Sequence, residues 1–141
     1  MADALTTDEL IENFGLFDDW QDRYRYLMDL GRALPELPEA DKVDGNIVKG
    51  CLSQVWLVPE VEALAEDRVD FRADSDSAIV RGLIAVLKVV YGNQSRADVG
   101  QIDIEDIFSQ LGLSEHLSPN RRNGFFAMVG KIQQLGTGAE A

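Results

Sequence analysis

The chain has 141 residues, of which 45% are hydrophobic and 27% are charged, a composition typical of one soluble globular domain. Thirteen basic against 25 acidic residues give a net charge of −12, which disfavours binding to nucleic acids or anionic membranes. Because opposite charges attract, we expect its partner to be a protein with a basic face. No apolar run reaches the length of a membrane span, and residues 1–5 lack the features of a signal peptide. We therefore expect a cytoplasmic protein with one domain over residues 1–141 and an ordered core over about residues 6–136.

The chain has one cysteine, Cys51, and one histidine, His116. A single cysteine cannot form an internal disulfide, and this pair cannot supply a typical structural zinc site or a four-thiolate iron–sulfur site. We therefore expect no metal site of these kinds.

Two helices and a long polar connection are predicted at the N-terminal end. Thr6 and Glu9 fit a capping box, which begins a short first helix. Apolar residues at helical spacing predict a second helix from residue 18 or 19 to residue 30, and Gly31 suits the position after its end. Prolines then exclude a helix, so residues 34–46 are expected to form a polar connection.

The middle of the chain predicts a small antiparallel sheet of about three strands. Ile47 and Val48 begin a short strand, which Gly50 and Cys51 interrupt. Residues 54–58 and 69–73 each alternate between apolar and polar side chains, as half-buried strands do.

Helices dominate the rest of the chain. Asp and Ser residues at positions 74–77 are expected to cap a helix over residues 78–91, whose nearly all-apolar surface predicts a buried central position. Two short helices, over residues 95–99 and 106–111, and a last helix from Ser118-Pro119 to about Gly136 follow. The order of helices, strands and helices predicts an α+β fold, with helices packed on one face of the sheet.

Cys51 is the candidate reactive residue. Gly50 removes a side chain beside the sulfur, and Lys49 places positive charge nearby, which favours the reactive thiolate. One alternative is an independent thiol enzyme in which His116 acts as the base, although a histidine near a helix end commonly caps carbonyl groups instead. Another is an adaptor whose cysteine is an inert, buried side chain. A cysteine that only passes an atom along needs no base.

The sequence resembles the SufE family, the sulfur acceptors of cysteine desulfurases. The stretch Gly50-Cys51-Leu52-Ser53-Gln54-Val55-Trp56-Leu57 looks like the family signature. Further similarity covers three other blocks in the same order, namely residues 20–37, residues 74–83, and residues 116–121 with Gly124. The resemblance implies an α+β fold similar to that of IscU-type scaffold proteins, although this chain lacks their additional metal-binding cysteines.

The resemblance also implies a sulfur relay. A pyridoxal-phosphate-dependent cysteine desulfurase would pass persulfide sulfur to Cys51, which would relay it to an iron–sulfur scaffold complex, and the chain would stimulate the desulfurase. Pyridoxal phosphate is expected only in that partner. Arg121 occupies the family's characteristic arginine position, where it would stabilise sulfur anions or dock the partner. Asp74 is expected to cap the central helix or to border the cysteine segment, and Leu52 and Trp56 either shelter the sulfur or fill the core.

Overall fold

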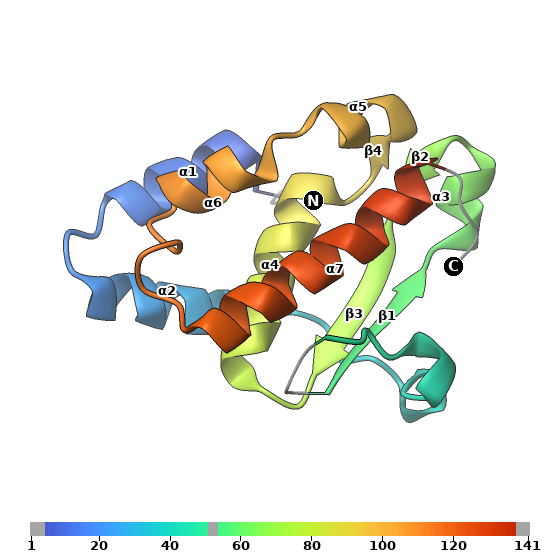
Figure 1. Cartoon of the computed structure of the whole chain (residues 1–141), viewed down its shortest axis with the longest axis horizontal. Helices are drawn as coiled ribbons and strands as arrows, with labels where there is room; N and C mark the ends of the chain where they lie inside the picture. Colours follow the sequence, from blue (N-terminus) through green and yellow to red (C-terminus); the bar gives the residue numbers. More distant parts are fainter. Residues whose placement is uncertain (1–4, 51–53, 138–141) are drawn as a thin grey trace.

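A computed structural model describes residues 5–50 and 54–137, and its elements form an α+β fold (Figure 1). The helices are α1 (Thr7–Gly15), α2 (Trp20–Ala33), α3 (Val61–Ala65), α4 (Ala78–Tyr91), α5 (Arg96–Gln101), α6 (Ile104–Gln110) and α7 (Pro119–Thr137). The strands are β1 (Val55–Pro59), β2 (Arg68–Val69), β3 (Phe71–Ser75) and β4 (Gln94–Ser95). Two short 3₁₀ turns, η1 (Glu39–Asp41) and η2 (Asp44–Asn46), interrupt the polar connection. The predicted fold class is confirmed.

The first two helices begin where the sequence predicts. Thr6 and Glu9 form the complete capping box of α1, and the Asp19 side chain accepts from the Gln21 amide at the start of α2. The predicted end of α2 at Gly31 is wrong, because the helix continues to Ala33. Gly31 lies inside it, where a Cβ atom would lie 2.7 Å from the backbone nitrogen of Gly82 in α4. Gly31 is therefore required because α2 and α4 approach each other closely there, not because the chain turns.

The strands form two antiparallel pairs rather than one sheet of three strands. β1 pairs with β3 from Val55↔Ser75 to Pro59↔Phe71, and an isolated bridge joins Ile47 to Trp56. Asp70 separates the single predicted strand over residues 69–73 into β2 and β3. β2 then pairs with β4, which the sequence does not predict, and α3 lies between β1 and β2.

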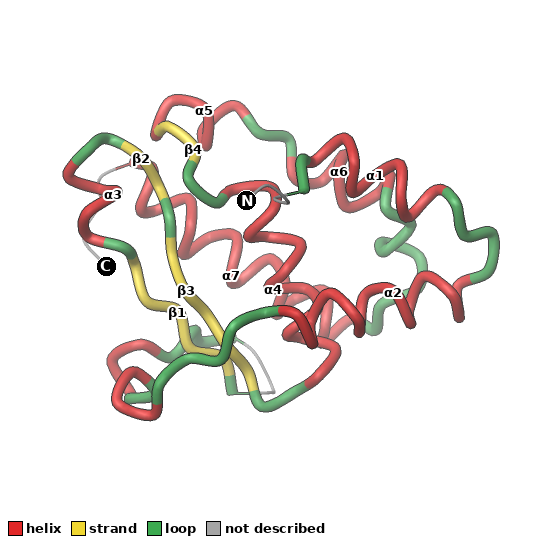
Figure 2. The backbone as a smooth tube through the Cα atoms, turned by 180° about the vertical axis from the view of Figure 1, so that it is seen from behind, coloured by secondary structure: helices red, strands yellow, loops and turns green. Residues whose placement is uncertain are grey.

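The two faces of the β1–β3 pair have different environments. Val55, Leu57, Phe71 and Ala73 belong to the hydrophobic core under the helices. The alternate side chains, which include Trp56 and Asp74, point the opposite way, as the strand period of two requires. Figure 2 shows residues 34–46 crossing the strands on this outer face, opposite α4 and α7.

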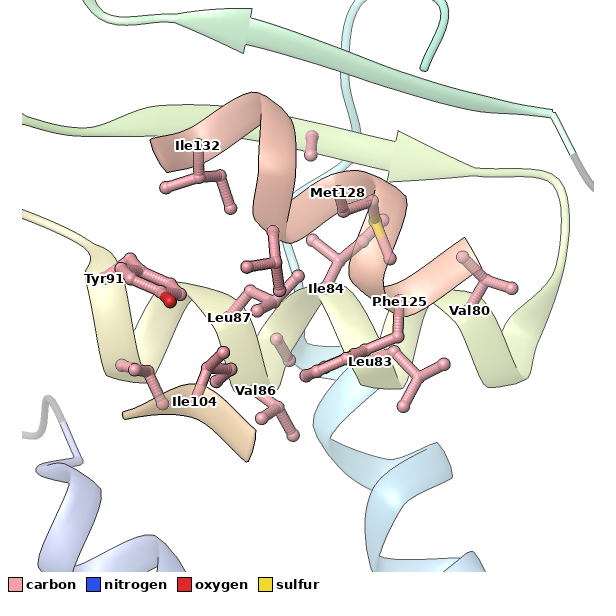
Figure 3. Close-up of a cluster of buried hydrophobic side chains, with 14 of the residues drawn as sticks. Val80, Leu83, Ile84, Val86, Leu87, Tyr91, Ile104, Phe125, Met128 and Ile132 are labelled. Atoms are coloured by element: carbon pink, nitrogen blue, oxygen red, sulfur yellow. The ribbon is translucent and has the colours of Figure 1, made fainter. Parts of the chain in front are cut away.

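Helix α4 is the buried centre of the molecule. Ser77 caps it by accepting from the Val80 amide at 3.4 Å, and almost every face of the helix is covered. Figure 3 shows its side chains packed against those of α7 and of α6. Ten of its residues are buried, which confirms the prediction of a central apolar helix. None of the helices in residues 5–50 and 54–137 has the length and hydropathy to cross a membrane.

Candidate functional site

The chain on either side of Cys51 is anchored by backbone pairing. The amide of Val48 donates to the carbonyl of Val55 at 2.8 Å, and Ile47 pairs with Trp56. The connection between these anchors spans residues 49–54, and Cys51, Leu52 and Ser53 lie outside the described residues. The site is therefore built here from the residues that flank the cysteine and from the elements that they contact.

Gly50 has a backbone reason for its identity. Its φ of +95° lies in the left-handed region, which side chains other than glycine's rarely adopt. An added Cβ would meet only the Cβ of Ala127 in α7, at 3.4 Å, which is close but leaves room for a small shift. The interpretation that Gly50 makes room for a sulfur donor stays a prediction, because the positive φ already explains the glycine.

Asp76 fixes the far end of the same connection. Its carboxylate accepts from the Gln54 amide at 3.1 Å, and its own amide donates to the Gln54 carbonyl at 3.3 Å. The sequence predicts that Asp76 caps α4 and that Asp74 either caps it or borders the cysteine segment, and the capping prediction is wrong for both residues. Ser77 supplies the cap, which leaves Asp76 free to hold the chain immediately after residues 51–53.

Asp74 is the centre of a buried polar cluster on the outer face of the strands. Its side chain is 2% exposed, forms an ion pair with Arg81, and accepts from the Leu37 amide at 3.0 Å and the Ser75 amide at 2.8 Å. Burial acts to raise the pKa of Asp74, but the two amides and the Arg81 guanidinium outweigh it and lower the pKa below its ordinary value. The carboxylate is therefore charged at neutral pH and has a structural role.

Arg81 and Lys42 connect this cluster to the rest of the fold. Arg81 also donates to the carbonyls of Gly31 and Leu34 at the end of α2. The Lys42 ammonium lies 3.7 Å from the Asp74 carboxylate and 5.5 Å from the centroid of the Trp56 ring. Trp56 thus belongs to the outer face beneath the polar connection, not to the main core.

A hollow of about 600 Å³ opens between the segment that precedes Cys51 and the middle of α7. Lys49 lines it from that segment and Lys131 from α7, and we call it the Lys49–Lys131 hollow. Ala127, with its small side chain, and Gly130, which has none, also line it, together with the acidic residue Asp44. Neither lysine forms an ion pair or a hydrogen bond through its side chain within the described part of the chain.

His116 and Arg121 do not line this hollow. The His116 ring stacks on Trp20 of α2 with 4.5 Å between ring centroids and 11° between the planes. The prediction that its imidazole caps a helix end is therefore wrong. Arg121 is exposed in the first turn of α7, where its amide donates to the Ser118 hydroxyl, and its side chain is unpaired among the described residues.

Comparisons with known proteins decide the family. The family model "SufE: Fe-S metabolism associated domain" matches residues 8–136. This chain belongs to the SufE family. It is 42% identical over 132 residues to an uncharacterized SufE-like protein of Rhizobium meliloti (strain 1021), with 93% of this chain and 94% of that protein covered. An uncharacterized SufE-like protein of Rhizobium etli is 44% identical over 128 residues, covering 90% and 86%.

The SufE-family chain also resembles a solved structure. A hypothetical protein from Thermus thermophilus, determined in solution, aligns with a TM-score of 0.73 at 17% identity, and the match covers 94% of both chains. At this identity the likeness supports the fold alone. The family match supports an association of this chain with Fe–S metabolism.

Two residues of this SufE-family site have roles that the sequence does not predict. In the sequence, Asp76 has the position of a helix cap. Lys131 has one weak signal, because it lies at helical spacing on one face of α7, beside the apolar face, with Ala127, Gly130 and Gln134. That spacing predicts a shared surface but not which segment faces it. Within residues 5–50 and 54–137, no group of three or more acidic, histidine or cysteine side chains is arranged to hold a metal ion.

Proposed function

We propose that this SufE-family protein accepts sulfur from a pyridoxal-phosphate-dependent cysteine desulfurase as a persulfide on Cys51 and relays it to an iron–sulfur scaffold complex. The observation that carries the proposal is the family match over residues 8–136, in a chain whose only cysteine falls within the family signature. Pyridoxal phosphate would belong to the desulfurase, and we expect no cofactor in this chain.

The transfer step needs no oxidant or reductant. The Cys51 thiolate attacks the outer sulfur of the donor's persulfide, and a new sulfur–sulfur bond forms on Cys51. The bond between the two donor sulfurs breaks, and its electron pair stays on the donor cysteine as a thiolate. One thiolate and one persulfide are thus exchanged for one persulfide and one thiolate, so atoms and electrons balance.

The flanking residues would assist this exchange by position and charge. Lys49 lies two residues before Cys51 with no other partner among the described residues, and its charge favours the thiolate and the persulfide anion. Gly50 and Asp76 would set the course of the chain on each side of the sulfur. Arg121, exposed at the start of α7, would contact the partner or a sulfur anion.

The alternative function, a thiol enzyme with His116 as base, has no specific observation in its favour. It requires the imidazole to act on the Cys51 sulfur, yet the ring lies flat on Trp20. Gly50, the described residue next to the cysteine, instead faces Ala127 near the middle of α7. The other alternative, an adaptor with an inert cysteine, is tested by the experiment below.

Intact mass measurement tests the proposal. The protein is incubated with its cognate desulfurase and free cysteine, and we expect a mass gain of one or more sulfur atoms that a thiol reductant removes. Cys51→Ser is the matched control and should gain none. If the natural chain gains no sulfur while the desulfurase turns over, the relay is wrong.

A further inference from the structure

The charges of this acidic protein are unevenly distributed around the site. The chain carries −12 overall, yet α7 contains Arg121, Arg122 and Lys131 and no acidic residue. The segment over residues 45–59, which contains Cys51, likewise has one basic residue, Lys49, and no acidic one. The Lys49–Lys131 hollow is lined by these two lysines and by one acidic residue, Asp44, so its lining is net positive in a molecule that is otherwise strongly negative.

The basic residues of these two segments also differ from the others in their pairing. Ion pairs within the described residues are formed by Arg25, Arg32, Lys42, Arg68, Arg72, Arg81, Lys88 and Arg96. Arg23 donates to the carbonyls of Phe17 and Leu111. Lys49, Lys131, Arg121 and Arg122 are the basic residues whose side chains form neither an ion pair nor a hydrogen bond with the described residues. Their charge is available to a molecule from outside.

The hollow has space as well as charge. A Cβ atom built on Gly130 or on Gly45 meets no other atom within 4 Å, so the floor of the hollow is open where these glycines stand. Gly130 is exposed on the outer side of α7, where helix propensity alone would favour another residue by about 1 kcal/mol. A protruding segment of a second molecule can therefore enter between Lys49 and Lys131.

We propose that the Lys49–Lys131 hollow is the docking surface for an acidic loop of the sulfur-donating desulfurase. This inference rests on the proposed function, which requires a protein donor to bring its persulfide to the residue two positions beyond Lys49. The overall charge of −12 repels nucleic acids and other polyanions at long range, whereas a protein loop with a few carboxylates can be attracted locally. Net charge alone predicts a partner with a basic face, whereas the local charge at this hollow favours an acidic one.

Charge reversal tests the docking surface. Kd for the cognate desulfurase is measured by calorimetry in a Cys51→Ser background, so that no sulfur is transferred during the titration. Lys49→Glu with Lys131→Glu should raise Kd at least about tenfold at low salt, and the difference should shrink in about 0.5 M salt. Arg25→Glu with Arg32→Glu changes the net charge equally on α2 and should leave Kd nearly unchanged. Asp44→Asn should lower Kd.

A steric variant tests the same surface without changing charge. Gly130→Gln should fill the hollow and raise Kd several-fold while α7 keeps or gains stability. Gly100→Gln is the matched control, since Gly100 also lies exposed in a helix, α5, with no atom near its added Cβ. Unfolding curves of both variants verify that each is folded.

The outcomes separate the two proposals. If the natural chain accepts sulfur but the lysine and Gly130 variants bind the desulfurase as it does, the docking surface is wrong and the relay stands. If those variants lose binding but Cys51 never gains sulfur, the docking surface stands and the relay is wrong. If the natural chain does not bind the desulfurase, the docking surface is wrong. It is also wrong if the chain binds inorganic phosphate as tightly as the desulfurase and the lysine variants lose both, because the lysines would then be a general anion site.

Discussion

Asp76 and Gln54 are joined by two reciprocal hydrogen bonds, from the Gln54 amide to the Asp76 carboxylate at 3.1 Å and from the Asp76 amide to the Gln54 carbonyl at 3.3 Å. This pair ties the end of the connection over residues 49–54 to the turn before α4. Because α4 is the buried centre of the fold, Gln54 is joined through this turn to a well-packed element.

Loss of the Asp76 carboxylate should impair sulfur acceptance more than stability. Asp76→Ala removes one exposed hydrogen bond, which costs at most about 1 kcal/mol in unfolding free energy. We expect the rate of persulfide formation on Cys51 to fall several-fold, because the chain after the cysteine is less restrained. Asp76→Asn keeps an acceptor oxygen and should retain most of the rate. An unchanged rate in the alanine variant would show that this pair does not position the site.

Breaking the Asp74–Arg81 ion pair should destabilise the fold strongly. Arg81→Met leaves the Asp74 carboxylate buried and loses the donors to Gly31 and Leu34, so we expect a loss of about 3–5 kcal/mol in urea unfolding. Arg25→Met removes an ion pair whose arginine is 71% exposed, and this control should change stability by less than about 1 kcal/mol. A similar small loss for both would contradict the structural role of Arg81.

Asp74 should also contribute to acid sensitivity. Its pKa is lower in the folded protein than in the unfolded chain, where a carboxyl titrates near about 4. The stabilisation is therefore complete above that unfolded value and is lost as pH falls through the lower folded one. Unfolding free energy measured between about pH 7 and pH 3 should fall less steeply for Asp74→Asn than for the natural chain. The variant should already be less stable at neutral pH.

The contact between Gly82 and α2 should not tolerate a side chain. A Cβ on Gly82 would lie 2.4 Å from the backbone carbonyl oxygen of Leu27, which cannot move aside cheaply. Gly82→Ala should therefore lower the unfolding free energy by about 3 kcal/mol or more, since the two helices must separate. Gly130→Ala, in an open position on α7, should be neutral or stabilise by up to about 1 kcal/mol. Thermal unfolding of the two variants measures the contrast.

His116→Ala should leave sulfur acceptance intact. The ring packs on Trp20, so its loss should cost about 1 kcal/mol of stability and alter tryptophan fluorescence. Persulfide formation on Cys51 should proceed at the natural rate. A severe loss of sulfur acceptance in a folded His116→Ala protein would instead favour the thiol-enzyme alternative.

Local signals in the sequence located most helices. Thr6, Asp19, Ser77, Ser95 and Ser118 each accept an amide hydrogen bond within the first turn of the helix that follows. Such caps act over three or four residues, so the sequence alone is enough to read them. The sequence does not indicate the strand pair β2–β4, because each strand has only two residues and is too short to show alternation.

Local sequence patterns indicate the roles of individual polar residues less well than the helix starts. Asp74 and Asp76 have the residue types and spacing of helix caps, but each is used by a distant segment, Asp74 by Leu37 and Asp76 by Gln54. Gly31 has the position of a helix end, yet it serves the crossing of α2 and α4. A side chain with two possible partners binds the one that the fold brings close in space. A local sequence pattern contains only the partner that is close along the chain.

The sequence by itself determined the family, the α+β class, the buried central helix and the single candidate nucleophile, because these depend on residue types, caps and periodicity along the chain. Only the tertiary structure decided what surrounds that residue. Lys49 and Lys131 are 82 positions apart, and their walls meet because α7 packs beside the segment that precedes Cys51. Net charge is a sum over all residues, whereas the charge that a partner meets depends on which of them share a surface and which are already paired.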